Sequence, residues 1–437
     1  MHVAVVGAGP AGLFCAIALG RRGHQVSVVD RDPGPAADGS WARQGVMQFH
    51  HPHGVRQQIL DALDAEMPEV HAGLLEAGAE HAVLPAQAGR PEQVVGLHCR
   101  RMTFERVLRA AAEAQPGVTL VRGHADEVLR SGGRATGVRV DGHDLAADLV
   151  LNASGRAGRL ADDVRTPGES SDCGLSYVSR QYALLPGAGL GPMNAPIGIV
   201  QTLPGYIVAV FLQDNRTFSA LIARASADRR LTSLRFTEAF EAAARAIPAL
   251  ADWVTAERSR PITPVLPGGR LHNTYRGQLD AEGRVGLPGL LHVGDSVCTT
   301  NPTAGRGIAI ALRQAARLVR FLDEHPGDPA AAALAFDDWC TEQVRPWYAD
   351  HVYWDADILR RWSGGDVDVT RRLPSDLIME ATAVDPSLMR VVGPFMAMQV
   401  LPSALDAVEP RAREIFASGW RPPAHPGPTN DELADLI

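Results

Sequence analysis

The sequence lacks lysine altogether. All 42 basic residues of the 437-residue chain are arginines, so chemistry that depends on a lysine amine is excluded. Long apolar runs are also missing, since none reaches the roughly 18 residues that a membrane-spanning helix requires. The first residues carry no charged segment followed by an apolar one, as a secretory signal peptide would. We therefore expect neither a membrane span nor a signal peptide.

Cysteine is scarce, and the chain has no excess of positive charge. The five cysteines are odd in number and show no C-x-x-C spacing, which is typical of reduced thiols in a cytoplasmic protein. The net charge is −8 and the isoelectric point is near 6.0, whereas a nucleic-acid-binding protein needs a clustered basic surface. We expect a cytoplasmic localisation and no nucleic-acid partner, and the sequence leaves the oligomeric state open.

The first thirty residues, "MHVAVVGAGPAGLFCAIALGRRGHQVSVVD", predict a strand, a tight turn, a helix and a second strand. A β-branched run over His2–Val6 predicts the first strand, and apolar residues at helical spacing over 11–22 predict the helix. Residues 25–29 form the second apolar run, which Asp30 ends. This order of elements is that of a dinucleotide-binding βαβ unit.

Three glycines give this G-x-G-x-x-G pattern its specific chemistry. Gly7 permits the tight turn, Gly9 lets the backbone approach a pyrophosphate, and Gly12 lets helix and strand pack closely. The free N–H groups at the helix start then face the phosphates, and Asp30 accepts hydrogen bonds from ribose hydroxyls. The residues predicted to bind the nucleotide end of a cofactor are Gly7, Gly9, Ala11, Gly12, Asp30 and Arg31.

A second glycine-containing loop follows an apolar strand much later in the chain. "LLHVGDSVCTTNPTAGRGIAIALRQAARLVRFL" contains a strand over 290–293, then Gly-Asp, a loop and a long helix. The segment resembles the Gly-Asp motif and the P-x-x-G-x-G loop of FAD-dependent hydroxylases. The resemblance implies that Asp295 binds the ribityl chain. It also places the amides near Gly305 and Gly307, after Pro302, at the pyrimidine edge of the flavin, where reduction builds up negative charge.

Two arginine-containing segments extend this resemblance to flavoprotein monooxygenases of the para-hydroxybenzoate hydroxylase fold. In "RQGVMQFHHPHGVRQQILDAL", Arg43 matches an arginine that contacts the flavin pyrophosphate in that family. In "RRMTFERVLRAAAEA", Arg101 matches an arginine that precedes a helix and contacts the flavin phosphates or ribityl chain. The resemblance covers roughly residues 1–325 and implies FAD as the cofactor.

Shorter stretches resemble bacterial FAD-dependent epoxidases that act on polyketides, which are relatives of squalene epoxidase. These stretches are "GVMQFHHPH", "ASGR", "LSYVSR" and "AVDPSLMRVVGPFMAMQVLPSAL". One departure concerns the reductant. Para-hydroxybenzoate hydroxylase-type enzymes carry Asp-Gly for FAD and NAD(P)H where this chain has Ser154-Gly155. Two-component, styrene monooxygenase-like enzymes also lack Asp-Gly, so we expect reduction of FAD by NAD(P)H directly or through a partner flavin reductase.

The expected fold class is α/β: a Rossmann-like FAD-binding domain with an inserted, mostly antiparallel β-sheet domain for the substrate and a C-terminal helical region. Alternating apolar runs such as "YIVAVFLQD" and "TFSALIARA", with a helix near 232–246, predict the inserted sheet. The Pro-rich end of the chain predicts a mobile tail. The expected boundaries are 1–165 and 276–325 for the FAD-binding domain, 166–275 for the sheet domain, and 326–437 for the helical region and tail.

These features predict an FAD-dependent monooxygenase of secondary metabolism. The resemblance implies that a flavin C4a-(hydro)peroxide transfers one oxygen atom from O2 to an apolar small molecule, by epoxidation or hydroxylation. The inserted sheet offers Tyr177, Tyr206 and Phe211 as candidate substrate-binding residues. Core packing is nevertheless the commoner role of any single aromatic residue.

Three other functions compete with this prediction. A flavin-dependent halogenase relays its oxidant through a lysine and carries W-x-W-x-I-P, but this chain has no lysine and its tryptophans never stand two positions apart. A flavin-dependent reductase of C=C bonds, or another FAD oxidoreductase, is an alternative within the same class. A non-catalytic flavin-binding module is the alternative from a different class.

The stretch "GVMQFHHPHG" holds three histidines, for which three explanations compete. A metal site needs three or four convergent ligands, and no partner pattern of histidines or carboxylates accompanies the cluster, so we expect no metal. A structural role is a loop made rigid by Pro52 that leads into a helix from about Gly54. The catalytic interpretation follows from Arg43, which brings the segment beside the flavin. There His53, and less surely His51, donates a hydrogen bond or passes a proton.

Overall fold

The computed structural model describes residues 1–43, 45–86 and 91–437. A five-stranded parallel sheet lies at its centre, in the order β19-β10-β1-β2-β6. The inner strands β1 and β10 are buried on both faces, which explains their largely apolar sequences. These strands come from distant parts of the chain, so the sheet is assembled from segments that are far apart in the sequence. The strands are β1 (His2–Val6), β2 (Gln25–Asp30), β6 (Val118–Arg122), β10 (Leu149–Asn152) and β19 (Leu290–His292).

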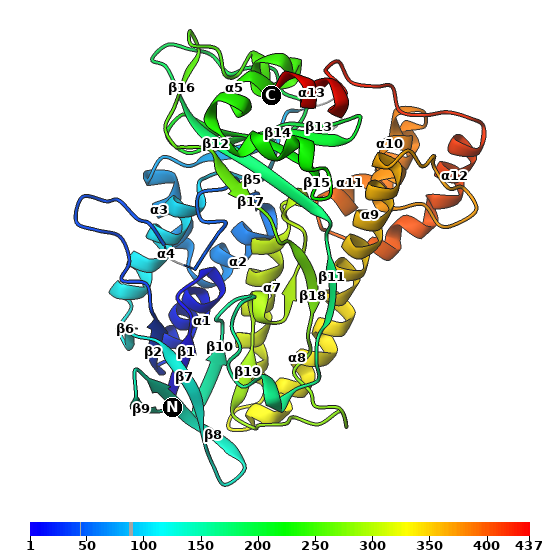
Figure 1. Cartoon of the computed structure of the whole chain (residues 1–437). Helices are drawn as coiled ribbons and strands as arrows, with labels where there is room; N and C mark the ends of the chain where they lie inside the picture. The colour runs from blue at the N-terminus through cyan, green and yellow to red at the C-terminus, as the bar shows by residue number, and fades with distance from the viewer. Residues whose placement is uncertain (44, 87–90) are drawn as a thin grey trace.

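Helices cover one face of this sheet and a small antiparallel sheet covers the other. On the helical face α1 packs between α4 and α7, and α7 also contacts α2 and α8 (Figure 1). The helices are α1 (Pro10–Arg21), α2 (Gln57–Glu66), α3 (Pro68–Glu76), α4 (Arg101–Ala114), α7 (Gly307–Glu324) and α8 (Pro329–Gln343). The small sheet comprises β7 (Ala125–Ser131), β8 (Arg134–Val140) and β9 (His143–Ala146).

A larger antiparallel sheet forms the inserted domain. Its order is β13-β14-β15-β12-β16, with β17 also paired to β12. One face buries Tyr182, Tyr206 and Phe218 against the helices, and the alternate residues face the FAD-binding domain. The elements are β12 (Leu175–Leu184), β13 (Gly198–Leu203), β14 (Tyr206–Gln213), β15 (Thr217–Ala225), β16 (Ser259–Pro261), β17 (Leu266–Gly268), α5 (Thr237–Ala246) and α6 (Pro248–Ala251). The fold class predicted from the sequence is confirmed.

Two short sheets connect these layers. One joins β3 to β5 and β4, and the other joins β11 to β18 and β20. The helix expected from about Gly54 begins only at Gln57, because Val55 and Arg56 first pair with β5 as a strand. The strands are β3 (Val55–Arg56), β4 (Glu80–Leu84), β5 (Gln93–His98), β11 (Glu169–Asp172), β18 (His272–Tyr275) and β20 (Cys298–Thr299).

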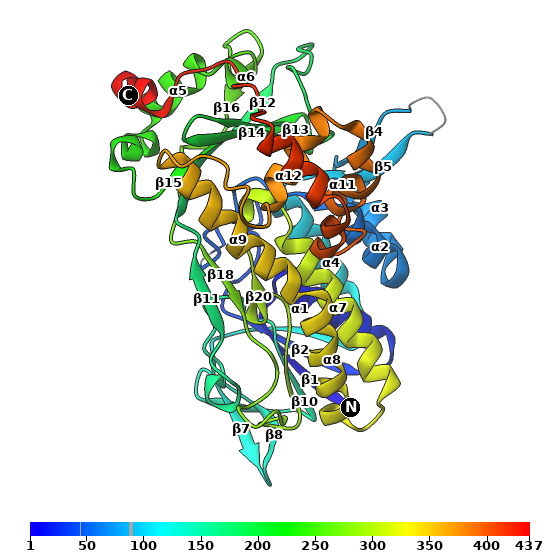
Figure 2. The same ribbon diagram turned by 90° about the vertical axis from the view of Figure 1, so that its right-hand side faces the viewer.

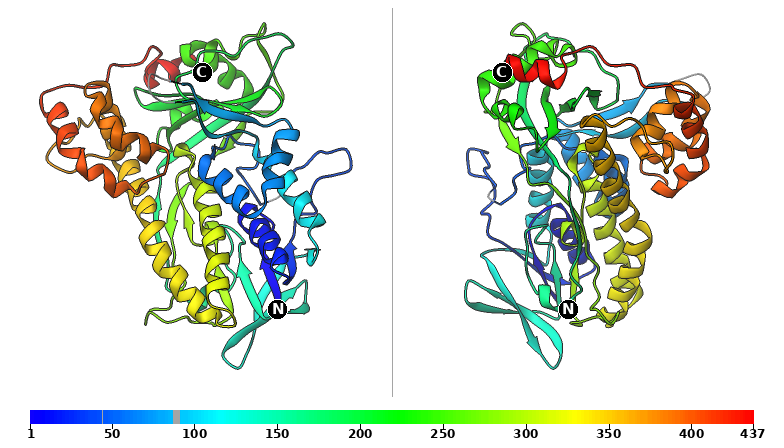
Figure 3. Two further views of the ribbon diagram at one scale, coloured as in Figure 1. Left: turned by 180° about the vertical axis from the view of Figure 1, so that it is seen from behind. Right: turned by 45° about the vertical axis from the view of Figure 1, so that its right-hand side comes forward.

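The C-terminal region is helical and packs along α7 and α8. Figure 2 shows α9 beside α7 and α8, with α11 and α12 farther along the same flank, and Figure 3 shows this region from behind. The helices are α9 (Arg345–Trp362), α10 (Ser375–Glu380), α11 (Met389–Met396), α12 (Glu409–Ala417) and α13 (Asn430–Leu436). No helix in the described ranges is long and apolar enough to cross a membrane.

The end of the chain differs from the mobile tail expected from its prolines. Thr429 and Glu432 form a capping box that starts α13, and Leu433 is fully buried against the inserted sheet domain. The hydroxyl of Tyr206 donates a hydrogen bond to the carbonyl of Pro428 at 2.7 Å. A single buried leucine in a short helix is a weak sequence signal, and the prolines before it masked that signal.

Candidate functional site

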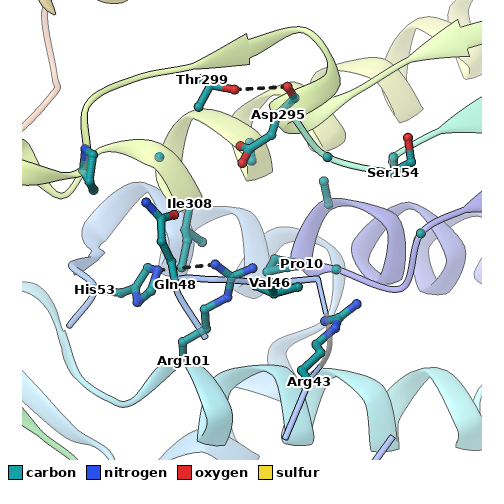
Figure 4. A pocket seen from close by; sticks show the side chains of 18 of the residues that line it. Pro10, Arg43, Val46, Gln48, His53, Arg101, Ser154, Asp295, Thr299 and Ile308 are labelled. Carbon is teal, nitrogen blue, oxygen red and sulfur yellow. Dashed lines mark hydrogen bonds between the residues drawn. The ribbon is translucent and has the colours of Figure 1, made fainter. Parts of the chain in front are cut away.

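A cleft lies at the carboxyl ends of β1, β2 and β10. This is the edge of an open α/β sheet at which ligands bind. Figure 4 shows Arg43 and Arg101 on one side of the cleft and Asp295 and Thr299 on the other. Apart from Gly12, every residue predicted to bind the cofactor lines this cleft: Gly7, Gly9, Ala11, Asp30, Arg31, Arg43, Arg101, Asp295, Pro302, Gly305 and Gly307.

The glycine turn at the cleft has the geometry that a bound dinucleotide needs. Gly7 has a positive φ of 108°, and a Cβ there would lie 2.4 Å from the carbonyl oxygen of Ala153. A Cβ on Gly12 would lie 1.9 Å from the carbonyl oxygen of Gly7, so this glycine allows helix and strand to pack. A Cβ on Gly9 would meet nothing within 4 Å, because this backbone faces the open cleft. The three glycines therefore leave room for a phosphate at the start of α1.

A network of buried charges lies below this turn. The Oδ2 atom of Asp30 accepts hydrogen bonds from the N–H of Ala8 at 2.6 Å and from Arg43 at 2.9 Å. The fully buried carboxylate of Glu105 pairs with both Arg43 and Arg101. Asp30 and Glu105 together balance the charges of Arg43 and Arg101. Each guanidinium has five N–H donors, so donors beyond these pairs are left for an anionic ligand. The pair of arginines and the carboxylate between them suit a pyrophosphate on the cleft side.

At the other end of the cleft stands the carboxylate of Asp295. Figure 4 shows its side chain directed into the cleft. Among the described residues its carboxylate oxygens have no hydrogen-bond partner, and its backbone carbonyl accepts from Thr299. Burial raises the pKa of this carboxyl, while Arg101 and Arg156 act in the opposite direction. Asp295 is half-buried and keeps free acceptor oxygens at the cleft, and the hydroxyl groups of a ribityl chain would be suitable donors.

The loop after Asp295 closes the far side of the cleft. Residues 302–304 form a 3₁₀ turn, and Gly305 follows in a left-handed conformation with φ of 61°. Helix α7 begins at Gly307, where a Cβ would meet nothing within 4 Å. The first N–H groups of α7 have no acceptor within the helix. The cleft is thus flanked by two helix starts, α1 and α7, whose dipoles favour negative charge.

The histidine segment forms the wall between cleft and inserted sheet. His53 lines the cleft, and its Nδ1–H donates to the carbonyl of His51 at 2.8 Å, while Arg101 donates to its Nε2 at 3.4 Å. His51 lies behind it and bonds to the hydroxyl of Ser179 at 2.7 Å. Burial lowers the pKa of His53 to about 3 and that of His51 to about 4. In the described parts of the chain no cluster of metal-ligating side chains occurs.

The three aromatic residues predicted to bind substrate take different positions. Tyr177 contacts the ring of His51 edge-on at 4.7 Å between ring centroids, and it lines a second cavity that is also bordered by Arg224. Tyr206 is fully buried in the core beneath α5 and α6, so its ring lies on the face of the sheet away from the cleft. Phe211 lies on the opposite face but lines neither of these two cavities.

Some residues of the site were not singled out by sequence reasoning. Glu105, which joins the two site arginines, lies one turn after Arg101 on the same predicted helix, and the resemblance at Arg101 was the available signal. Gln48 lines the cleft near Tyr177: burial raises the pKa of Tyr177, and Gln48 acts in the opposite direction. Arg56 donates to two carbonyls of the 302–307 loop. Neither Gln48 nor Arg56 carries a motif, because their roles depend on contacts far along the chain.

Comparison with known proteins agrees with this geometry. Residues 2–90 match the family model described as FAD dependent oxidoreductase. The solved structure of the flavin-dependent brominase Bmp2 covers 96% of this chain and 100% of its own, with a TM-score of 0.64 and 14% identity. That of 2-methyl-3-hydroxypyridine-5-carboxylic acid oxygenase covers 83% and 91%, with a TM-score of 0.56 and 17% identity. The chain has the fold of the FAD-dependent monooxygenases.

Sequence relatives include flavin monooxygenases as well. Kynurenine 3-monooxygenase of Salinispora arenicola is 31% identical over 181 residues, which are 35% of this chain and 36% of that enzyme. The match therefore spans about a third of that relative's length. Protein Rv3254 of Mycobacterium tuberculosis is 28% identical over 372 residues, which are 74% of this chain and 73% of that protein. The glycine turn, Asp295 and the α7 loop of the monooxygenase fold thus occur together in one chain.

Proposed function

We propose that this protein is an FAD-dependent monooxygenase that inserts one oxygen atom from O2 into an apolar small molecule, by epoxidation or hydroxylation. The observation that carries the proposal is the single cleft that joins the glycine turn after β1 to the free carboxylate of Asp295 and the start of α7. One extended cofactor reaches both ends. The five cysteines are all free and buried, which supports a cytoplasmic location.

The described residues fit FAD at each point of the cleft. The open backbone of Gly9 and the start of α1 would hold the pyrophosphate, with Arg43 and Arg101 beside it. The carboxylate of Asp295 would accept hydrogen bonds from the ribityl hydroxyls. The N–H groups at Gly307 would lie at the pyrimidine edge. Bound FAD supplies the reaction with O2, and the protein supplies binding, orientation and exclusion of water.

The residues between the cleft and the inserted sheet would orient the substrate. The ring of Tyr177 packs edge-on against His51, which lies behind the cleft residue His53, and it borders the second cavity. Burial raises the pKa of Tyr177 to about 12, so its hydroxyl remains a hydrogen-bond donor at neutral pH. We expect Tyr177→Phe to raise KM for substrate severalfold while FAD affinity stays at the wild-type value, measured by steady-state kinetics and FAD titration.

Halogenation is the alternative function that the solved structures suggest, since a flavin-dependent brominase has a similar fold. Structures at 14% identity support the fold and not the activity. Flavin halogenases relay their oxidant through a lysine, and this chain has none. The absence of a lysine therefore favours direct oxygen transfer from the flavin site to the substrate.

The reductant is the second part of the proposal. Ser154 lines the cleft where an Asp-Gly pair would stand in single-component relatives, and its hydroxyl donates to Asn152 at 2.6 Å. Its side chain is thus occupied within its own turn and brings no carboxylate to the cofactor. We infer that a separate flavin reductase supplies reduced FAD.

The test compares three sources of electrons with the same purified holoprotein and a panel of apolar alkene and arene substrates. One sample receives NADPH alone, another NADH alone, and the third NADH with a separate flavin reductase, and incorporation of ¹⁸O from ¹⁸O2 is followed by mass spectrometry. We expect labelled product only with the reductase, and no product in a control containing reductase and FAD without the protein. Rapid NADPH oxidation by the protein alone would contradict the two-component part. Failure of the protein to bind FAD in either oxidation state would overturn the whole proposal.

A further inference from the structure

Arg306 stands between the two glycines of the α7 loop, but its side chain points away from the cleft. Its guanidinium lies 4.7 Å from the ring centre of Trp347 and 4.9 Å from that of Phe395. It donates a hydrogen bond to Asp350 at 2.9 Å, and both side chains of this pair are 3% exposed. Trp347 and Asp350 belong to α9, and Phe395 belongs to α11. The residue between Gly305 and Gly307 is therefore anchored in the C-terminal helices.

The surroundings of this pair keep it charged and fixed. The second oxygen of Asp350 accepts a hydrogen bond from Ser375, which connects the pair to α10. His351 lies 3.4 Å from Arg306 and is neutral, because burial and the two nearby arginines hold its pKa well below the usual value. Breaking such a buried pair leaves an uncompensated charge and is strongly destabilising. The geometry of Arg306 is thus set by three C-terminal helices.

A second arginine holds the backbone of the same loop, and it too contacts α11. Arg56 donates to the carbonyl oxygens of Gly305 at 3.0 Å and Ala304 at 2.6 Å. Its remaining nitrogen donates to the carbonyl of Met396 at 2.8 Å, at the end of α11. Among the described residues no carboxylate pairs with Arg56, so its positive charge is compensated only by carbonyl dipoles. Burial lowers its pKa to about 10, which leaves it charged at neutral pH.

The geometry points to a two-arginine clamp, formed by Arg56 and Arg306, that makes the C-terminal helices part of the cofactor site. The clamp positions the loop of residues 304–307 against the pyrimidine edge of the flavin, and the unpaired charge of Arg56 favours reduced over oxidised FAD. This inference rests on the proposed binding of FAD. Neither arginine is a catalytic residue, because both face away from the cleft through the loop backbone.

The physical reason lies in the direction of the loop peptides. A trans peptide places its carbonyl and the following N–H on opposite sides. The carbonyl of Gly305 is held by Arg56, so the next N–H, that of Arg306, points the other way. The N–H groups that open α7 follow directly and have no intrahelical acceptor. Fixing this backbone prepares donors for the negative charge that reduction adds, which preorganised dipoles stabilise best.

The experiment uses the FAD-loaded protein and four variants. Arg306→Gln removes the charge and the pair with Asp350, and Arg306→Lys keeps the charge but loses the planar contact with the two rings. Arg56→Gln removes the unpaired charge. The matched control is Arg361→Gln, because Arg361 pairs with Asp357 and Asp376 inside the same helical region. The readouts are the FAD dissociation constant, the midpoint potential of bound FAD, and hydrogen exchange of residues 302–310.

We expect both Arg306 variants to bind FAD about tenfold more weakly, the lower end of what groups that orient ligand-contacting residues contribute. Amides of residues 302–310 should exchange faster in these variants, with or without FAD. In Arg56→Gln the affinity for reduced FAD should fall about tenfold more than that for oxidised FAD, which lowers the two-electron midpoint potential by about 30 mV. Arg361→Gln should lose thermal stability while keeping the wild-type dissociation constant and potential.

Two results separate the clamp from the proposed function. If the wild-type protein binds FAD but Arg306→Lys and Arg56→Gln match Arg361→Gln in affinity, exchange and potential, the clamp is wrong and the function stands. If the wild-type protein binds no FAD, both fall. Should Arg306→Gln fail to fold, Arg306→Lys and Arg56→Gln still decide the question, because each keeps a polar group at its site.

Discussion

At the residue scale, the groups around His53 determine its protonation state and its hydrogen bonds. Its Nδ1–H is held by the carbonyl of His51, and its Nε2 accepts from Arg101. Burial, and secondly the charge of Arg101, lower its pKa to about 3. At neutral pH the ring is therefore uncharged and has no free proton to donate towards the cleft. A role in orienting Arg101 fits these contacts better than the proton transfer expected from the sequence.

This assignment predicts the pH behaviour of a His53→Ala variant. Because His53 stays neutral above about pH 4, the ratio of wild-type to variant turnover should be constant between pH 6 and 8. FAD should bind a few-fold more weakly, since Arg101 loses an acceptor worth about 1 kcal/mol. Steady-state rates across this pH range and FAD titrations provide the check. A wild-type profile with an ionisation near 6.5 that disappears in the variant would restore the catalytic interpretation, and His51→Ala serves as the control.

At the scale of elements, the turn from β1 to α1 separates glycines that fold the protein from the glycine that meets the ligand. A Cβ at position 12 would overlap the carbonyl oxygen of Gly7, whereas a Cβ at position 9 would enter open space. We expect Gly12→Ala to unfold the domain or lower its melting temperature sharply. Gly9→Ala should keep wild-type circular dichroism and melting of the FAD-free protein but lose most of its FAD affinity. Equal effects in both variants would contradict these separate roles.

The sequence predicted the features that depend on local interactions and missed those that depend on contacts between residues far apart in the chain. The βαβ turn, the strand before Asp295 and the start of α7 were predictable, because glycine spacing and apolar runs are local signals. The placement of Tyr206 in the core was not, because alternation along β14 does not tell which face of a sheet meets the helices. The contacts of Arg56 and Arg306 with α11 and α9 were also hidden. They join residues far apart in the chain, and no local pattern marks them.

A buried carboxylate links α9 to β18 and to the residue before the α7 loop. Asp355 accepts hydrogen bonds from Asn273 and from Asn301, both at 2.7 Å. Burial raises its pKa from 3.8 to about 6. The folded state therefore binds a proton more tightly than the unfolded state. Its contribution to stability is fully present below about pH 4 and is lost as the pH rises through 6.

Asp355→Asn should remove this pH dependence. The raised pKa of Asp355 corresponds to about 3 kcal/mol of unfolding free energy. The difference in unfolding free energy between wild type and variant should therefore change by about that amount between pH 4 and pH 7. The amide leaves one asparagine donor without an acceptor, so the variant should also be less stable at every pH. Urea unfolding at several pH values measures both effects, and a parallel pH dependence in the two proteins would contradict the assignment.

At the scale of the whole molecule, the C-terminal end of the chain packs against the inserted antiparallel-sheet domain. Helix α13 packs against α5 and against the turn of residues 229–235. The core of that domain includes Leu433 together with residues from β12, β14 and β15. The domain predicted over 166–275 is thus completed by a segment from the C-terminus. Removing the last residues should consequently weaken this antiparallel sheet and not the cleft at the parallel sheet.

This architecture predicts different effects for two leucines on the same short helix. Leu433 is fully buried, whereas Leu436 is 50% exposed. Truncation of a buried leucine to alanine costs about 2–5 kcal/mol through lost transfer energy and the cavity left behind, and the terminal position favours the lower end. We therefore expect Leu433→Ala to lower the unfolding free energy by about 2 kcal/mol and Leu436→Ala to change it little. FAD affinity should remain at the wild-type value in both variants, because α13 lies on the far side of the sheet from the cleft. Denaturant unfolding and FAD titration of the two variants measure this, and equal stability of both would mean that the end of the chain is not part of the core.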